Sequence, residues 1–215
     1  MNNNDFILHK NFPMASRDAD FEGNLRVSSL INFFIQAAWQ SAEELGFGYS
    51  QLSRQKLGWV LSRFKIKINE LPTLPGELSV TTWPKGLNRL FYMRDAEFLD
   101  AEQNKIAAIT SAWLVFDVHS KRPKLLKTEV PALFHLKDKH AIDEDLPVLK
   151  FEGEPVSSIV YTVRYNDIDI NQHLTTVRYL DFIFDTYSVD FHKDHAPQEL
   201  TVNFLKEITF GDKVI

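Results

Sequence analysis

The sequence predicts an α+β protein built from two copies of one unit, each an antiparallel sheet wrapped around a long helix. A long apolar helix followed by several strand-like segments occurs once in full, and the same order begins again in the second half. An eight-residue motif is also repeated: Asp18–Leu25 (DADFEGNL) aligns with Asp167–Leu174 (DIDINQHL). The second copy has Asn171 and His173 where the first has Glu22 and Asn24, which indicates a duplicated unit with one working copy.

The first unit opens with a strand expected near residues 6–12 and a polar turn at residues 16–24. A helix follows over residues 28–45, and Gly46 is expected to end it. Apolar residues occupy most of the circumference of this helix, so we expect it to be enclosed rather than to lie on a surface. The remaining polar stripe consists of Asn32, Gln36, Gln40, Glu43 and Glu44.

Four strands are expected after the helix, over residues 58–68, 77–83, 90–98 and 106–117. In the first of them apolar and basic residues alternate with a period of two, which is typical of a sheet with one solvent-facing side. The alternating residues are Phe64, Ile66 and Ile68 against Arg63, Lys65 and Lys67. Turn-forming residues separate the strands at 72–76, 85–88 and 100–104.

Proline and charged residues interrupt this pattern over residues 119–157, which we interpret as the connection between a first domain, 1–118, and a second, 158–215. The second domain is expected to contain a strand at 158–164, another enclosed helix from about Thr176, and a strand at 199–208. About three strands of the first copy have no counterpart there, so we expect the second copy to be truncated at its C-terminal end, because an enclosed helix with half a sheet exposes apolar surface.

Composition excludes several classes of function. The net charge of -5, from 24 basic and 29 acidic residues, argues against a general nucleic-acid binder. The chain has no cysteine, which excludes disulfides, thiolate metal sites and a cysteine nucleophile. The seven histidines show no metal-ligand spacing, and no metal is expected. No leader-like segment or apolar run of about 20 residues is present, so we expect a soluble, cytoplasmic protein without a membrane span.

The candidate site lies at the entrance of the second helix, where Asp169, Asn171 and His173 follow one another at two-residue spacing. Aspartate and asparagine are favoured there simply as helix caps. Capping does not account for His173, however, because the first copy has Asn24 at that position and Glu22 in place of Asn171. Histidine exchanges protons near neutral pH, and a helix start offers N–H groups to a developing oxyanion, so the motif suits hydrolytic chemistry.

Two segments resemble the acyl-acyl carrier protein (acyl-ACP) thioesterases, which have two hotdog domains in one chain. The stretch Arg164–Tyr179 (RYNDIDINQHLTTVRY) is similar to the Asp-x-Asp-x-Asn-Gln-His segment of that family and its following helix start. Leu205–Ile208 (LKEI) stands where the family has Arg-Glu-Cys, and weaker similarities lie at Trp59–Arg63 and Gly76–Trp83. The resemblance implies cleavage of the thioester between a fatty acyl chain and acyl carrier protein, without a cofactor.

The resemblance also implies roles for individual residues. Asn171 would position the thioester carbonyl or the attacking water, and His173 would transfer protons. Asp169 would hold this array, and Glu207 would act as general base or as partner of the histidine. Plant members often have cysteine where this chain has Ile208, so the resemblance here favours base-assisted attack by water.

Three other functions stay open at this point: an acyl-CoA thioesterase, a non-catalytic acyl-binding protein and a hotdog dehydratase. The resemblance implies that the first domain binds the acyl chain, yet the tryptophans Trp39, Trp59, Trp83 and Trp113 are expected in the core. The basic stretch Lys121–Lys124 with Lys127 suits either an ordinary solvated surface or a docking site for the acidic carrier protein. A homo-oligomer is neither indicated nor excluded by the sequence.

Overall fold

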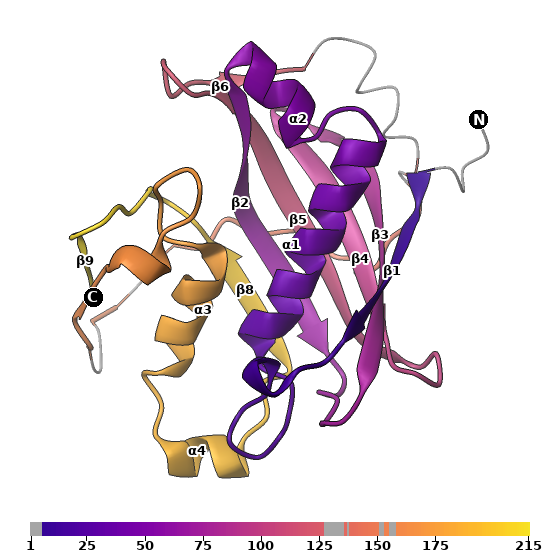
Figure 1. Cartoon of the computed structure of the whole chain (residues 1–215), viewed down its shortest axis with the longest axis vertical. Helices are drawn as coiled ribbons and strands as arrows, with labels where there is room; N and C mark the ends of the chain where they lie inside the picture. The colour runs from indigo at the N-terminus through magenta and orange to yellow at the C-terminus, as the bar shows by residue number, and fades with distance from the viewer. Residues whose placement is uncertain (1–5, 127–135, 137, 151–152, 155–157) are drawn as a thin grey trace.

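A computed structural model describes residues 6–126, 136, 138–150, 153–154 and 158–215, and shows a seven-stranded antiparallel sheet with the long helix α1 (Val27–Glu44) against one face (Figure 1). The strands follow the order β1-β3-β4-β5-β2-β8, and β6 pairs with β5. Their bounds are Leu8–Pro13 for β1, Leu57–Ile68 for β2, Glu77–Asn88 for β3, Phe91–Leu99 for β4, Lys105–Asp117 for β5, Pro123–Lys124 for β6 and Glu199–Asn203 for β8.

The helix α1 is enclosed, as the sequence predicts. Eleven of its 18 residues are buried, and Leu30, Ile31 and Phe34 have no exposed surface. Its C-terminus is closed by two backbone hydrogen bonds, from Gly46 N to Glu43 O at 3.1 Å and from Phe47 N to Ala42 O at 3.0 Å. Gly46 has a φ of +79°, the left-handed conformation that this helix ending requires. A short helix, α2 (Tyr49–Leu52), follows directly.

The four strands after α1 are confirmed, but the turn predicted at 85–88 is wrong. Residues 85–88 belong to β3, whose pairing with β4 shifts register between Pro84 and Gly86. Asn88 pairs with Phe91, so the chain reverses at residues 89–90 instead. A bulge inserts an extra residue without ending the strand, which explains why lysine and glycine there resembled a turn.

Part of the proline-rich connection packs on the sheet face opposite α1. The buried Asp95 on β4 accepts a hydrogen bond from Ala141 N at 2.9 Å and forms an ion pair with Lys85 Nζ at 3.1 Å. Trp83 Nε1 donates to Lys139 O at 3.1 Å. The described residues near 139–144 therefore cover the first sheet, while 127–135, 137, 151–152 and 155–157 lie outside the described part of the chain.

The second half contains β7 (Tyr161–Thr162), a 3-10 turn η5 (Tyr165–Asp167), α3 (Thr176–Phe184), α4 (Val189–Asp194), and β9 (Lys213–Val214). The predicted helix start at Thr176 is confirmed. The strands expected at 158–164 and 199–208 are shorter than predicted, since only β7 and β8 form. Helix α4, capped by the Ser188 side chain, was not predicted, since the polar residues around His192 and His195 are equally typical of a loop.

The prediction that the second helix is enclosed is wrong for the described residues. Leu180 is the buried residue of α3, and Ile183 is 37% exposed. Helix α3 packs against α1, while only the short strands β7, β8 and β9 form in this half. These strands are too short to cover more than one side of α3, so its apolar residues are not all buried.

The predicted internal repeat is present in the backbone itself. Phe12 pairs with Leu78 between β1 and β3, and Tyr161 pairs with Val214 between β7 and β9. The isolated bridge between Ala19 and Leu25 recurs between Ile168 and Leu174. Helices α1 and α3 then begin at equivalent positions, two residues after Leu25 and Leu174 respectively. The two copies therefore share one local fold up to the helix start.

The two copies join through β2 and β8, which extends the first sheet by one strand (Figure 1). Their register is symmetric about the pair of Lys65 and Thr201. Ile68 N donates to Gln198 O and Phe204 N to Ser62 O, both at 2.8 Å, as two halves of one symmetric contact. This self-complementary pairing is typical of a two-fold interface, here between repeats of one chain.

Candidate functional site

The Asp169 carboxylate organises the loop that carries the site. Its Oδ1 accepts hydrogen bonds from the backbone N–H of Asn171 at 2.8 Å and of His173 at 3.2 Å, and its Oδ2 from Asn171 Nδ2 at 3.3 Å. Gln172 has a φ of +64°, which completes the tight turn. In the first copy Asp20 Oδ1 accepts the two equivalent backbone bonds, each at 2.9 Å. Asp169 thus has a structural task that does not depend on the histidine.

A second carboxylate fixes the helix that follows. Asp167 is buried, accepts from Arg164 N at 2.8 Å, and pairs with Arg178 Nε at 2.8 Å. Arg178 also contacts Asp181 at 2.7 Å. Burial acts to raise the pKa of Asp167, but the hydrogen bonds from Arg164 and Arg178 outweigh it and lower that pKa. The loop and α3 are therefore tied together by a partly buried charge network.

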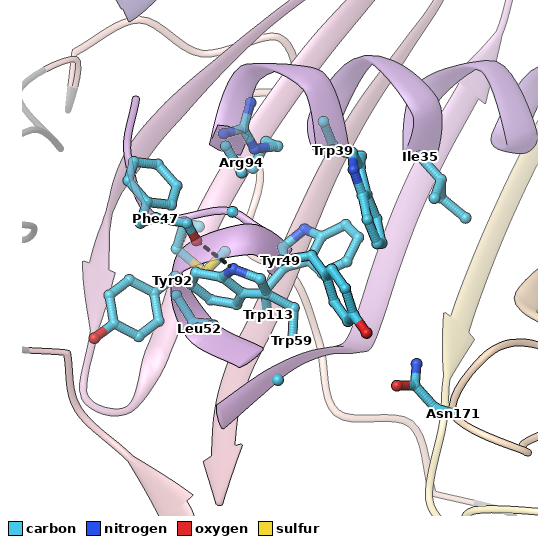
Figure 2. Close-up of a pocket in the computed structure, with 15 residues that line it drawn as sticks. Ile35, Trp39, Phe47, Tyr49, Leu52, Trp59, Tyr92, Arg94, Trp113 and Asn171 are labelled. Carbon is cyan, nitrogen blue, oxygen red and sulfur yellow. Dashed lines mark hydrogen bonds between the residues drawn. The ribbon is translucent and has the colours of Figure 1, made fainter. Parts of the chain in front are cut away.

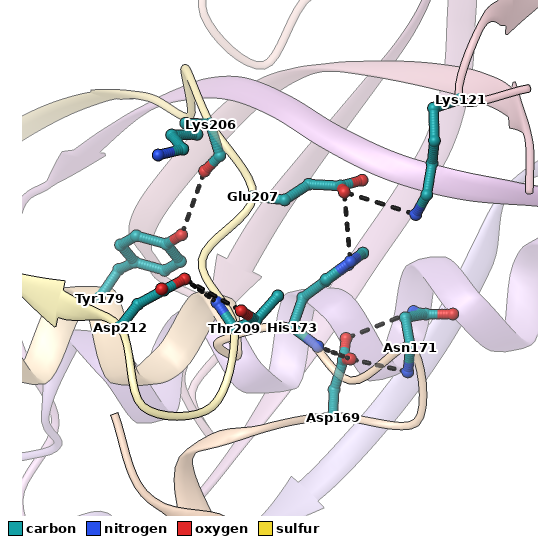
Figure 3. A network of polar contacts seen from close by, with 9 residues as sticks. All are labelled: Lys121, Asp169, Asn171, His173, Tyr179, Lys206, Glu207, Thr209 and Asp212. Atoms are coloured by element: carbon teal, nitrogen blue, oxygen red, sulfur yellow. Dashed lines mark hydrogen bonds and ion pairs between the residues drawn. The ribbon is translucent and has the colours of Figure 1, made fainter. Parts of the chain in front are cut away.

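The structure brings His173 and Glu207 together (Figure 3). His173 Nε2 lies 3.2 Å from Glu207 Oε2, and the histidine side chain is 18% exposed against 44% for the glutamate. Glu207 is not on a strand as the sequence predicted, because β8 ends at Asn203. The loop that holds it is fastened by Leu174 N, which donates to Ile208 O at 2.8 Å, and by the bridge between His173 and Thr209.

Two further side chains at this site were missed by sequence reasoning. Lys121 Nζ lies 3.4 Å from Glu207 Oε2, although it comes from the turn after β5. Tyr179, on the first turns of α3, lies close enough to Glu207 that burial and the charge of that carboxylate raise the pKa of the phenol. Its hydroxyl contacts Lys206 O at 3.4 Å. Lys121 is far from the motif in the sequence, so nothing near the motif predicts its contact with Glu207. Tyr179, by contrast, follows His173 by six residues, at the start of the next helix.

Asn171 extends from this polar cluster toward an apolar pocket (Figure 2). All other lining residues come from the first half of the chain, mainly from α1, α2 and strands β2, β4 and β5. The expectation that all four tryptophans are core residues is wrong for Trp39, which is 48% exposed. Trp59 and Trp113 are half-buried and line the pocket with it. Only Trp83 of the four is fully buried.

The arrangement suits hydrolysis of an activated carbonyl at the end of an apolar chain. A histidine paired with a carboxylate can transfer protons, a carboxamide can orient a carbonyl or a water, and the pocket can hold the chain. Across the described ranges, histidine, aspartate and glutamate nowhere gather in a group of three or more that could hold a metal ion. No helix within those ranges is long and apolar enough to cross a membrane.

Fold and site together define a double hotdog protein with one polar site beside an apolar pocket. Models of the acyl-ACP thioesterase N-terminal and C-terminal domains match residues 6–134 and 153–215. The chain therefore belongs to the acyl-ACP thioesterase family, and the resemblance seen in the sequence is confirmed.

Known proteins agree with this assignment. The chain is 22% identical to a chloroplastic palmitoyl-acyl carrier protein thioesterase of Gossypium hirsutum, over 94% of this chain and 52% of that protein. The chain is 28% identical in sequence to an acyl-ACP thioesterase from Bacteroides thetaiotaomicron. Its structure matches the crystal structure of that protein with a TM-score of 0.82, over 99% of this chain and 86% of the other. The 12:0-ACP thioesterase of Umbellularia californica, 20% identical with a TM-score of 0.83 over 96% and 80% of the chains, shares the fold. The chain spans about half the length of the curated relatives it matches.

Proposed function

We propose that this protein is a thioester hydrolase that releases free fatty acid from fatty acyl-ACP by base-assisted attack of water, without a cofactor. One observation carries the proposal. Asn171 lines the apolar pocket, while His173, two residues further along the same loop, is paired with Glu207 at 3.2 Å. An acyl chain in the pocket would therefore end with its carbonyl beside the proton-transfer pair.

The roles of the residues follow from their contacts. His173 removes a proton from the attacking water and passes one to the Glu207 carboxylate, while the water oxygen bonds to the thioester carbon. When the C–S bond then breaks, the same pair returns a proton to the leaving thiolate, which departs as the thiol. Asn171 orients the thioester carbonyl or that water, since it lines the pocket and lies on the same loop as His173. Asp169 supports catalysis indirectly, because it holds the backbone of both Asn171 and His173. A thioester is electrophilic enough that these groups suffice in principle.

In this proposal the first domain, residues 1–118, binds the acyl chain and has a degenerate site, and residues 158–215 supply catalysis. Asn24 stands at the position of His173 in the repeated loop. The loop contact of Leu25 N with Pro72 O matches that of Leu174 N with Ile208 O, which sets Leu71 at the position of Glu207. The first copy therefore lacks both members of the proton-transfer pair, while it contributes nearly all of the pocket.

The proposed partner is acyl carrier protein, and a cytoplasmic location belongs to the same proposal. The basic stretch after β5 would be its docking surface, although Lys121 already contacts Glu207 and Lys127 lies outside the described residues. Charge reversal at Arg122 and Lys124, which are exposed, should weaken turnover of acyl-ACP and spare a small thioester. Equal loss with both substrates would exclude this docking surface.

The test is thiol release from matched acyl-ACP and acyl-CoA substrates by the wild type and by His173→Ala, with folding checked by circular dichroism. We expect release from acyl-ACP that falls by about a hundredfold or more in the variant. Thiol release from acyl-CoA alone would mean that the protein is an acyl-CoA thioesterase. Binding of acyl chains without thiol release from either carrier would make the protein a non-catalytic acyl-binding protein.

A further inference from the structure

One lysine reaches the candidate site from the turn that follows β5. Lys121 Nζ donates a hydrogen bond to Glu207 Oε2 at 3.4 Å, and His173 Nε2 lies 3.2 Å from the same oxygen (Figure 3). Among the described residues these two are the only hydrogen-bond or ion-pair partners of the Glu207 side chain. Without Lys121, therefore, His173 alone would orient this carboxylate.

The surroundings of Glu207 hold its side chain only weakly. The side chain is 44% exposed, and it lies on an irregular segment, since β8 ends at Asn203. The backbone there is fixed by the hydrogen bond from Leu174 N to Ile208 O at 2.8 Å, but a glutamate side chain still has several rotatable bonds. With a single contact, this carboxylate would often point away from the histidine ring, so a second contact on the same oxygen matters for the pair.

The turn that carries Lys121 fixes the point from which the lysine side chain starts. Asp117 Oδ1 accepts hydrogen bonds from His119 N at 3.0 Å and from Ser120 N at 2.8 Å. Lys121 N donates to Asp117 O at 2.8 Å, and Asp117 N donates to Arg122 O at 2.9 Å. Lys121 closes the turn with a φ of +54°, a conformation that lysine adopts less readily than asparagine or glycine. Four hydrogen bonds therefore hold the backbone from which the ammonium group reaches Glu207.

We propose that Lys121 is a positioning residue, which holds the Glu207 carboxylate against His173. The inference rests on the proposed hydrolase only for the reaction that this pair performs. The carboxylate can accept a proton from the ring only while the two groups lie within hydrogen-bond distance, and a small misplacement of such a group slows a reaction strongly. Lys121 keeps that distance short, because its ion pair is made to the oxygen that faces the ring.

A role of Lys121 in docking acyl carrier protein predicts a different result. A docking charge acts only on substrates that carry the protein, and chiefly on KM, whereas a residue that positions the proton-transfer pair acts on kcat with every substrate. An acyl thioester of N-acetylcysteamine separates the two roles, because this small substrate lacks the carrier protein altogether.

The first experiment measures steady-state thiol release from this small thioester by Lys121→Asn. Asparagine removes the charge and suits the positive φ, so the turn is retained. We expect kcat to fall about tenfold while KM changes by less than about twofold, and we expect Lys121→Arg, which restores a cation, to recover most of the loss. The matched control is Lys56→Asn, because Lys56 is also exposed, has a φ of +59° and makes no ion pair among the described residues.

Lys56→Asn should keep the wild-type kcat, since it makes the same change at a turn away from the site. The proposal is overturned if Lys121→Asn turns over the small thioester as fast as the wild type does, or if it loses activity only with acyl-ACP, as a docking charge would. An equal loss in Lys56→Asn would also overturn it, because the effect would then come from net charge or from any lysine turn of this kind.

A second experiment needs no turnover and observes the contact itself. The NMR resonance of His173 Nε2 depends on its contact with Glu207, so Glu207→Gln marks the position of this resonance when the carboxylate is absent. In Lys121→Asn we expect the resonance to move toward that position, and an unchanged resonance would contradict the positioning role. If the resonance moves as expected but the wild type releases no thiol from any thioester, the proposed hydrolase is wrong and the positioning contact stands.

Discussion

At the scale of single residues, comparison of the loops before α1 and α3 separates the residues that build the loop from those that supply the chemistry. Asp20 and Asp169 accept equivalent backbone hydrogen bonds, yet only the second loop presents a histidine, which lies against Glu207. The repeat predicted the loop and singled out the histidine, because it marks which residues differ, whereas Glu207 was expected only from the resemblance to the family. The sequence could not predict Lys121, since a contact between a turn after β5 and a loop after β8 depends on the docking of the two copies.

This separation can be tested with paired substitutions. Asp169→Ala and Asp20→Ala should each lower the free energy of unfolding by about 1–3 kcal/mol, because each leaves backbone N–H groups without their acceptor. Only Asp169→Ala should also lower thiol release. Urea unfolding and steady-state kinetics on both variants provide the measurement. A comparable loss of activity in Asp20→Ala would mean that the first loop is part of the working site.

At the scale of elements, helix ends and charge networks hold the site in place. The long helix was predictable because its pattern is apolar on most sides and Gly46 follows it. Helix α4 and the short β8 were not, because the second half has little sheet to bury apolar residues and local capping then decides. The bulge in β3 was missed because lysine and glycine there suit a turn equally well.

Gly46→Ala measures how much the left-handed glycine at the C-terminus of α1 contributes to the free energy of unfolding. No heavy atom lies within 4 Å of a Cβ added at Gly46, so the substitution causes no clash. The φ of +79° remains unfavourable for alanine, and we expect a loss of about 1–2 kcal/mol in the free energy of unfolding. Thermal or urea unfolding measures it. Unchanged stability would show that the helix can end in another conformation.

Asp167→Asn tests the network at the start of α3. The folded-state pKa of Asp167 is lowered, so its ionised form stabilises the fold above the unfolded-state pKa, and this contribution is lost as pH falls through the folded value. The wild type should therefore exceed the variant in stability at neutral pH, and the difference should shrink below about pH 4. Unfolding curves across that range decide it; a difference independent of pH would point to packing instead.

At the scale of the whole molecule, the chain is a pseudo-dimer in which one repeat supplies the pocket and the other supplies the polar site. The symmetric pairing of β2 and β8 and the packing of α3 on α1 place Asn171 at that pocket. Duplication and fold class were predictable because the repeat and the helix pattern are local. The pocket was not, because it depends on which aromatic side chains the fold leaves half-buried, as with Trp59 and Trp113.

The proposed mechanism requires that His173 and Glu207, brought together by that assembly, act as one proton-transfer unit. The most direct measurement is a double-mutant cycle of thiol release from acyl-ACP with His173→Ala, Glu207→Ala and the double variant, all confirmed as folded. Residues that act as a unit are strongly non-additive, so each single variant should lose about as much activity as the double. If the two losses multiply in the double variant, His173 and Glu207 act independently and this mechanism is wrong.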